Sequence, residues 1–523
     1  MGLAFSVEVD AASDLAADVT RTDALITVEA LSAVRSGPAP QSVEVLIMDR
    51  SLSMAGRGKL DEAKRAMCAA IDTLPDGTYL GIVAGNHRAE VVHPVDGGGV
   101  VRIDAAGREA AKRRVVSLLP EGGTAIGTWL ECADRLFAAT AAEDAVRHAV
   151  LYTDGRDEHE TPEALDSALA ACGDRFVCDA RGLGDDWEYG ELLRITQQLH
   201  GTAKAVVSAA DLTEDFTELM RRARRIVVPR VYLGLRLNSR FRLGFVRQTR
   251  PVEADLTGQR QQHGDEVHIP LGAWSPEVRQ YHLSLRFDPD ALPVDEDLRA
   301  ARITLRAERP GGERPPYADT RAVVVRRRAT PGFRTAQPAD LTRVESQREL
   351  GTAMRACADA WQRGDLARAD RELAIAVELA ERLGDANRLA LLRSVRVIRG
   401  GQPALRRNVT RGEMQQLGLD STRTGALPAT GAAPLTGAFP GRPADDGVHR
   451  RVCPHCGTTT TARLLKHCET CGNRFDAPSP DGRSRGDGLP AVDRQPGPGG
   501  HRVADGGPAP GARGDDGEPR DAV

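Results

Sequence analysis

The hydrophobic pattern of residues 42–224 is that of an α/β domain. Short apolar segments such as VEVLIM (43–48), a continuous apolar run, and the predicted strand HAVLYTD (148–154) alternate with amphipathic stretches such as KLDEAKRAMCAAIDTL (59–74). A strand buried on both faces is apolar throughout, and helical periodicity between such strands indicates crossover helices. The pattern therefore predicts a Rossmann-like, doubly wound parallel sheet with helices on both faces over residues 42–224.

After about residue 225 the hydrophobic period changes to two. In VYLGLRL (231–237) and HLSLRF (282–287) every second residue is apolar, as in a strand with one buried face. We therefore expect an antiparallel β-sandwich over residues 225–330. Residues 1–41 contain FSVEVDA and ALITVEAL, which alternate in the same way. We expect these N-terminal strands to be part of the same sandwich, with the α/β domain inserted between its strands.

The C-terminal part of the chain changes character several times. Helical periodicity interrupted by Gly-Asp turns predicts a helical hairpin or small bundle over residues 338–399. Residues 400–450 are rich in Gly, Ala, Pro and Thr, a composition that predicts a flexible linker. A compact segment with paired cysteines follows at 451–476. Gly, Pro, Asp and Arg dominate residues 477–523, which predicts a disordered tail.

Composition and charge indicate the cellular compartment of the protein more clearly than its function. The chain has 523 residues, enough for several domains, and its net charge of −4 gives no reason to expect nucleic acid or a membrane as a partner. Its start lacks a basic segment followed by an apolar run, and no stretch reaches 18 uncharged apolar residues. Five of the nine cysteines are scattered, as in proteins of a reducing compartment. We expect a cytoplasmic protein.

Oxygen-bearing residues follow three of the predicted strands and turns. Asp49, Ser51 and Ser53 form a D-x-S-x-S motif directly after the 43–48 run, and Thr124 ends a G-G-T turn. Asp154 lies in the T-D-G with which the 148–154 strand ends. Ligands of open parallel sheets collect at the carboxyl ends of the strands, where these segments are expected to meet. Two carboxylates and three hydroxyls are hard donors that suit Mg²⁺ or a similar cation, such as Mn²⁺ or Ca²⁺.

The order and spacing of these motifs resemble the metal-ion-dependent adhesion site of von Willebrand factor type A (VWA) domains. The resemblance implies that Ser51, Ser53 and Thr124 coordinate the cation through their hydroxyls, and that Asp49 and Asp154 act directly or through water. It also implies an open coordination position for an acidic side chain of a partner protein. An incompletely neutralised cation would attract such an anion.

Each element of this site has an ordinary alternative explanation. D-x-S-x-S occurs by chance in loops and as a helix N-cap, and G-G-T and T-D-G are common turns. Their combination in the expected order favours the metal site. Asp185 and Asp186, in a turn after a later strand, are interpreted as turn and helix-cap residues and are not assigned to the metal. We see no nucleophile–base pair near the site, so the protein is not expected to be an enzyme.

Two C-x-x-C-G motifs near the C-terminus predict a second metal site. Cys453, Cys456, Cys468 and Cys471 provide the four thiolates of a closed, structural Zn²⁺ site, and the segment is similar to a short zinc ribbon. A segment of this size cannot bury a core, so the metal would supply its folding energy. The alternative is a redox C-x-x-C pair, but neither pair lies at a helix start in a βαβ unit.

The function implied by these features is partner binding. We expect a non-catalytic intracellular adaptor or scaffold, similar in layout to bacterial intracellular multidomain VWA proteins. One alternative is an accessory subunit of an AAA+ ATPase or metal-insertion complex, whose ATPase must be a separate protein because the chain has no P-loop motif. Another is a nucleic-acid-associated factor acting through the zinc ribbon. Thr422 and Thr424, in the predicted linker, are candidate phosphorylation sites for a phosphothreonine-binding partner, against the alternative of a neutral docking segment.

Overall fold

The computed structural model describes residues 2–33, 41–95, 97–140, 145–206, 209–309, 311–425, 451–453 and 459–460. The chain divides into two compact units, Met1–Ala477 and Pro478–Val523, and all described residues belong to the first. The predicted disordered tail over 477–523 lies outside the described residues.

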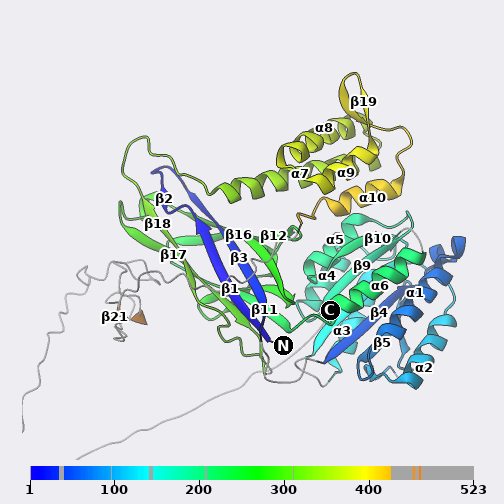
Figure 1. Ribbon diagram of the computed structural model, residues 1–523. Helices are drawn as coiled ribbons and strands as arrows, with labels where there is room; N and C mark the ends of the chain where they lie inside the picture. The colour runs from blue at the N-terminus through cyan, green and yellow to red at the C-terminus, as the bar shows by residue number, and fades with distance from the viewer. Residues whose placement is uncertain are drawn as a thin grey trace, which may run out of the picture. The chain divides into compact units, whose positions relative to one another are not determined.

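The α/β part is built on a mixed sheet whose central strands are parallel (Figure 1). The strand order is β10-β9-β8-β4-β5-β6, with β7 also pairing with β5. β6 and β7 run antiparallel to β5, because only residues 86–88 join β5 to β6 and a crossover needs a longer connection. The sheet is thus mixed, and not parallel throughout as predicted. Its strands are β4 (Ser42–Asp49), β5 (Tyr79–Gly85), β6 (Ala89–His93), β7 (Val101–Arg102), β8 (Val146–Thr153), β9 (Val177–Leu183) and β10 (Ala203–Val206).

Helices cover both faces of this sheet. Alternate residues of β4 point to opposite faces: Val45 and Ile47 join one apolar cluster, and Leu46 and Met48 join the other. The first cluster is completed by α3 (Ile126–Ala138), α4 (Pro162–Cys172) and α5 (Tyr189–Gln198). The second is completed by α1 (Lys59–Thr73), α2 (Ala105–Val116) and α6 (Ala209–Ala223). Both clusters are buried, which is why apolar residues predominate on both faces of the central strands.

Two further sheets combine the N-terminal segment with residues 228–327. One has the order β1-β3-β16-β12-β13 and the other β14-β15-β11-β17-β18-β2, with every pair antiparallel except β18 with β2. The larger strands are β1 (Gly2–Ala11), β3 (Arg21–Ala33), β11 (Val228–Leu237), β12 (Phe241–Arg250), β15 (Glu266–Trp274), β16 (Glu277–Phe287), β17 (Asp297–Ala307) and β18 (Arg321–Arg327). The short ones are β2 (Asp14–Leu15), β13 (Ala254–Asp255) and β14 (Gln261–His263).

These two sheets share one apolar cluster. Ile26 of β3 and Leu283 of β16 contribute from one sheet, and Leu233 of β11 and Ile303 of β17 from the other. The period of two in the sequence places these side chains on one face of each strand. β3 pairs with β16 along most of its length, so strands that precede and follow the α/β part in the chain belong to the same sheet.

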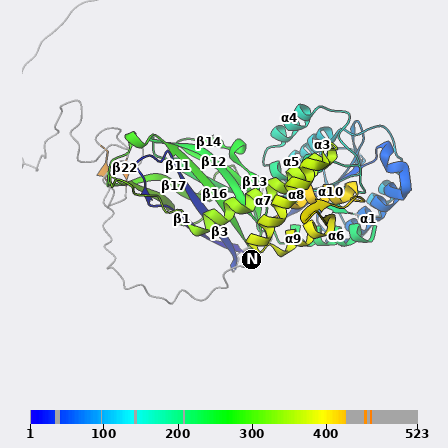
Figure 2. The same ribbon diagram turned by 90° about the horizontal axis from the view of Figure 1, so that it is seen from above.

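Three helices follow the sheets: α7 (Ala339–Gln362), α8 (Leu366–Leu383) and α9 (Ala386–Val395). Figures 1 and 2 show α7 and α8 lying side by side, and both contribute to a shared apolar cluster. Gly384 ends α8 with a left-handed backbone, and the Asp365 and Asp385 side chains cap α8 and α9. In the described ranges, no helix is long and apolar enough to cross a membrane.

The prediction of a flexible linker over residues 400–450 is wrong for residues 400–425. A hairpin of β19 (Arg396–Arg399) and β20 (Gln402–Leu405) turns at Gly400 and Gly401, both with positive φ. α10 (Arg411–Asp420) follows, and Thr410 with Glu413 forms a capping box at its start. Met414 and Leu417 are buried in the same apolar cluster as α7 and α8. Burial of these few apolar residues outweighs the Gly-rich local composition on which the prediction rested.

The residues that follow α10 form hydrogen bonds with both the sheets and the α/β part. The Glu253 amide donates to the Thr422 carbonyl at 2.7 Å, and the Thr424 hydroxyl donates to the Thr249 carbonyl at 2.5 Å. Thr422 and Thr424 are 2% and 8% exposed. A kinase could reach these hydroxyls only after the segment had left its place, so their burial argues against the predicted phosphorylation sites.

Candidate metal centre

Two strand ends place the predicted acidic residues next to each other. Asp49 is the last residue of β4, and Asp154 directly follows β8. β4 and β8 are parallel neighbours, with Met48 opposite Tyr152, so their carboxyl ends meet at one edge of the sheet. Thr124 lies before the start of α3 at the same edge. The sequence therefore brings together carboxylates that are more than a hundred positions apart.

Hydrogen bonds link these side chains into one cluster. The Ser51 amide donates to Asp49 Oδ1 at 2.8 Å, and the Ser51 and Ser53 hydroxyl oxygens are 2.8 Å apart. The Ser53 hydroxyl donates to Asp154 Oδ1 at 2.6 Å. On the other side of Asp49, the Thr153 hydroxyl donates to Oδ2 at 2.7 Å. Both carboxylates are thus held in place by hydroxyl and amide donors.

Gly155 marks the space that these oxygens surround. A Cβ atom built on Gly155 would lie 3.2 Å from Thr124 Oγ1, 3.4 Å from Ser53 Oγ and 3.9 Å from Asp49 Oδ2. Oxygen atoms from two separate segments, the 49–53 motif and Thr124, therefore converge on a small volume that a side chain at Gly155 would fill. The structure brings all five predicted residues (Asp49, Ser51, Ser53, Thr124 and Asp154) to this place.

The two carboxylates are buried and incompletely compensated. Asp49 and Asp154 are both 0% exposed. Burial, with the nearby Asp154 charge, raises the pKa of Asp49 to about 6 despite the bonds from Ser51 and Thr153. The Lys59 ammonium donates to Asp154 Oδ2 at 2.5 Å and lies 3.4 Å from Asp186 Oδ2. Burial alone would lower the pKa of Lys59, but Asp154 and Asp186 raise it, so the ammonium stays charged.

The donors present fit a hard divalent cation. Carboxylate and hydroxyl oxygens are the ligands that Mg²⁺, Mn²⁺ and Ca²⁺ take in proteins. Within the described ranges, no cluster of three or more His, Cys, Asp or Glu side chains could hold a metal ion. The site at Asp49 and Asp154 has only these two carboxylates, and its other three donors are hydroxyls. The assignment of the five residues as metal ligands stays a prediction.

A cavity of about 830 Å³ opens above this cluster. Ser51, Ser53, Thr124 and Gly155 of the cluster line it. Its lining also includes Leu52, His87, Arg156, Glu158, His159, Asp186 and Arg411. Arg411 is the first residue of α10, so the helical part of the chain reaches the cavity of the α/β part.

Sequence reasoning missed four residues of this site. Thr153 was part of the quoted T-D-G motif but received no role. Lys59 lies at the start of α1, and Asp186 was interpreted as a turn residue. Lys59 pairs with both Asp154 and Asp186, which are distant from it in the sequence. No local signal identifies Arg411, because it reaches the cavity only through the packing of α10 on α5.

The predicted zinc site falls mostly outside the described residues. Cys453 is described and is 2% exposed, whereas Cys456, Cys468 and Cys471 lie outside the described ranges. The zinc assignment therefore stays a prediction.

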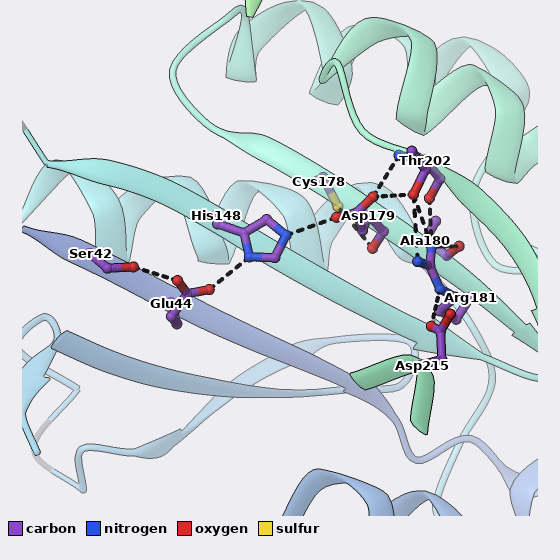
Figure 3. A network of polar contacts seen from close by, with 9 residues as sticks. All are labelled: Ser42, Glu44, His148, Cys178, Asp179, Ala180, Arg181, Thr202 and Asp215. Carbon is purple, nitrogen blue, oxygen red and sulfur yellow. Dashed lines mark hydrogen bonds and ion pairs between the residues drawn. The ribbon is translucent and has the colours of Figure 1, made fainter. Parts of the chain in front are cut away.

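A second polar cluster lies in the amino-terminal halves of the same parallel strands (Figure 3). His148 of β8 is 2.7 Å from Glu44 Oε2 of β4 through Nδ1, and 2.9 Å from Asp179 Oδ2 of β9 through Nε2. Arg181, two residues further along β9, pairs with Asp215 of α6. All five side chains are buried. Sequence analysis did not identify this cluster.

Each charge in this second cluster has an opposite partner. Burial alone would lower the pKa of His148, but the charge of Glu44 and the bond to Asp179 raise it to about 10. Burial alone would raise the pKa of Asp179, but His148 and Arg181 hold it well below its usual range. The ring is therefore a buried imidazolium between two carboxylates, a closed ion-pair network with no free coordination position.

Comparisons with known proteins agree with this fold. A family model for the von Willebrand factor type A domain matches residues 44–205. A solved structure of a von Willebrand factor type A protein from Catenulispora acidiphila is 32% identical, with a TM-score of 0.74. The match covers 82% of this chain and 98% of that chain. The crystal structure of the ArnB paralog VWA2 from Sulfolobus acidocaldarius covers 81% of this chain and 99% of that one. Its TM-score is 0.50, and at 12% identity it shows the fold alone.

The α/β part is therefore a VWA domain. The chain belongs to the von Willebrand factor type A family that includes the Catenulispora acidiphila protein, and the likeness extends well beyond the VWA domain itself. A curated relative, an uncharacterized protein of Synechocystis sp., is 31% identical over 228 residues, which is 43% of this chain. The chain spans about half the length of that relative, 52%.

Proposed function

We propose that the protein is a non-catalytic adaptor that binds an acidic side chain of a partner protein through a divalent cation at the VWA site. The observation that carries this proposal is the convergence of Asp49, Ser51, Ser53, Thr124 and Asp154 around Gly155. A bound Mg²⁺ or similar cation would supply an electrophilic position for an external carboxylate. VWA domains often mediate protein interactions, and the matched region includes all five residues.

The charge balance of the site supports capture of an anion. Asp49 and Asp154 supply two negative charges, and the Lys59 ammonium already offsets one of them. With a divalent cation in place the cluster would carry a net positive charge in a buried setting. Such a site attracts a carboxylate more strongly than a fully neutralised one.

Hydrogen bonding in the cluster supports binding in preference to catalysis. The Ser53 hydroxyl donates to a carboxylate, and the Ser51 hydroxyl contacts Ser53. A serine nucleophile instead needs a general base such as an imidazole within hydrogen-bond reach. The imidazoles of His87 and His159 line the cavity, and within the described part of the chain neither is bonded to Ser51 or Ser53.

The proposal also includes the β-sandwich, the zinc site and the cytoplasmic location that the sequence predicts. We interpret the two sheets around the shared apolar cluster as a β-sandwich that carries the VWA domain as an insertion. We propose that Cys453, Cys456, Cys468 and Cys471 hold a structural Zn²⁺, and that the adaptor works in the cytoplasm. An AAA+ protein is one class of partner that the proposal allows.

Filling the space at Gly155 provides the sharpest test. In Gly155→Ala the new methyl group would lie 3.2 Å from Thr124 Oγ1, so we expect Mg²⁺ or Mn²⁺ affinity to fall at least about tenfold by calorimetry. The matched control is Gly190→Ala on α5, where an added Cβ meets nothing within 4 Å. Asp49→Ala should abolish binding of the cation.

The adaptor role is tested by capture from extracts of the source organism. The full chain should retain partners in Mg²⁺, lose them in EDTA, and fail to retain them in both Asp49→Ala and Gly155→Ala. Gly190→Ala should behave like the unmodified protein. Capture that is unaffected by chelation and by both site variants would overturn the proposal.

A further inference from the structure

Arg411 lies on the wall of the metal-site cavity although it belongs to the helical part of the chain. It is the first residue of α10, which packs against α5. Its Nη2 donates to Glu188 Oε1 at 2.7 Å and to the Asp186 carbonyl at 3.4 Å. The side chain is 31% exposed and lines the cavity, so part of the guanidinium is available to a molecule there.

A second guanidinium uses the same acceptor. Arg156, which also lines the cavity, lies 2.8 Å from Glu188 Oε1, the same oxygen that accepts from Arg411. The other oxygen of Glu188 accepts from Gln362 Nε2 at 3.3 Å. One carboxylate therefore serves two guanidinium groups. Glu158 is a further carboxylate on the wall, but it is exposed, and within the described ranges it makes no ion pair with either arginine.

We propose that the cavity recognises a peptide with two acidic side chains, one at the cation position and the second at Arg411 and Arg156. This inference rests on the proposed function, since the first carboxylate is the one bound through the cation. The second carboxylate of the peptide would give Arg411 and Arg156 a further acceptor besides Glu188. Guanidinium groups bind carboxylates through paired hydrogen bonds of fixed geometry, which makes this second contact selective.

The size of the cavity agrees with a ligand larger than one carboxylate. Its volume of about 830 Å³ is within the range of pockets that bind ligands larger than a single carboxylate group. Ser53, Thr124 and Arg411 all line this one cavity, so a single peptide can contact both positions. Because Arg411 belongs to α10, selectivity at this VWA site would depend on a residue outside the VWA domain.

A peptide array separates the two carboxylate contacts. Each peptide carries one Asp and, at a spacing of one to six positions, either Glu or Gln, with neutral polar residues elsewhere. Binding of the full-length protein is measured in Mn²⁺ and in EDTA. We expect metal-dependent binding of all Asp peptides and, at one or two spacings, about tenfold tighter binding of the Glu peptide than of its Gln counterpart.

Variants of Arg411 then assign the second contact. Arg411→Gln should reduce the Glu-over-Gln preference to less than about threefold while metal-dependent binding of the Gln peptides stays unchanged. Arg411→Lys, which keeps the charge but not the paired hydrogen bonds, should keep only part of the preference. Arg407→Gln, an exposed arginine in the preceding turn, is the matched control and should keep all of it. A preference that survives in Arg411→Gln, or equal binding of Glu and Gln peptides at every spacing, would overturn this inference alone. Absence of metal-dependent binding to any peptide would overturn the proposed function as well.

Discussion

At the carboxyl edge of the VWA sheet, Asp49 and Asp154 are buried among hydroxyl groups, with the Lys59 ammonium as their nearby cation. A second cluster begins in the amino-terminal halves of the same strands, where Glu44 and Asp179 flank His148. It extends along β9 to Arg181, which pairs with Asp215 of α6. Both clusters use acidic side chains from neighbouring parallel strands, and in both the carboxylates are buried. They differ in how completely the negative charge is compensated by the protein itself.

This difference separates a binding site from a structural network. In the amino-terminal cluster each carboxylate has a cationic partner within hydrogen-bond distance, so an added ion would have to displace an existing pair. At the carboxyl edge, Asp49 has hydroxyl and amide donors but no cationic partner of its own within the described residues. Buried negative charge that the protein leaves uncompensated is what an external cation can stabilise.

The largest effect is expected from breaking the closed network. Arg181→Met removes a buried guanidinium and leaves Asp215 with only the partly exposed Lys204 as its partner. Removing one member of a buried ion pair costs about 3–5 kcal/mol. We expect this loss in the free energy of unfolding, measured with urea in EDTA. Arg221→Met, an exposed position on α6 whose ion pair with Glu218 is also exposed, is the control and should change stability by less than about 0.5 kcal/mol.

A smaller effect is expected from pH. The folded protein binds the His148 proton more tightly than the unfolded chain does, because the pKa is raised from 6.5 to about 10. The stabilisation is therefore complete below pH 6.5 and is lost as pH rises through about 10. We expect the free energy of unfolding to fall by about 3 kcal/mol between pH 7 and 10. The same decline in His148→Gln would contradict the assignment of this dependence to His148.

The smallest effect is expected at Lys59, and it tests the carboxyl edge. Lys59→Met removes the positive charge beside Asp154, so cation affinity should rise about fivefold, from a Coulomb term of about 1 kcal/mol. Affinity for an acidic peptide in saturating Mn²⁺ should fall by a similar factor, because the site is less positive. Calorimetry measures both, with Lys64→Met on the same helix as control. Weaker cation binding in Lys59→Met would show that Lys59 supports the site and does not compete with the cation.

Signals for part of the C-terminal fold were present in the sequence and were outweighed by composition. Gly400-Gly401 between two short segments is a typical two-residue hairpin turn, and both glycines have the positive φ that such a turn requires. Thr410 and Glu413 have the spacing of a capping box before a helix. The Gly- and Pro-rich stretch that follows led to the prediction of one continuous linker. Local turn and capping chemistry was the better guide there.

The sequence by itself determined the VWA fold and the order in which Asp49, Thr124 and Asp154 reach one edge of the sheet. Apolar periodicity reports which face of each strand or helix is buried, and parallel strands necessarily align their carboxyl ends. Only the tertiary structure decided that Lys59 pairs with Asp154 and that Arg411 lines the same cavity. Such contacts depend on how distant helices pack on the sheet, and no repeat or spacing in the chain records that packing.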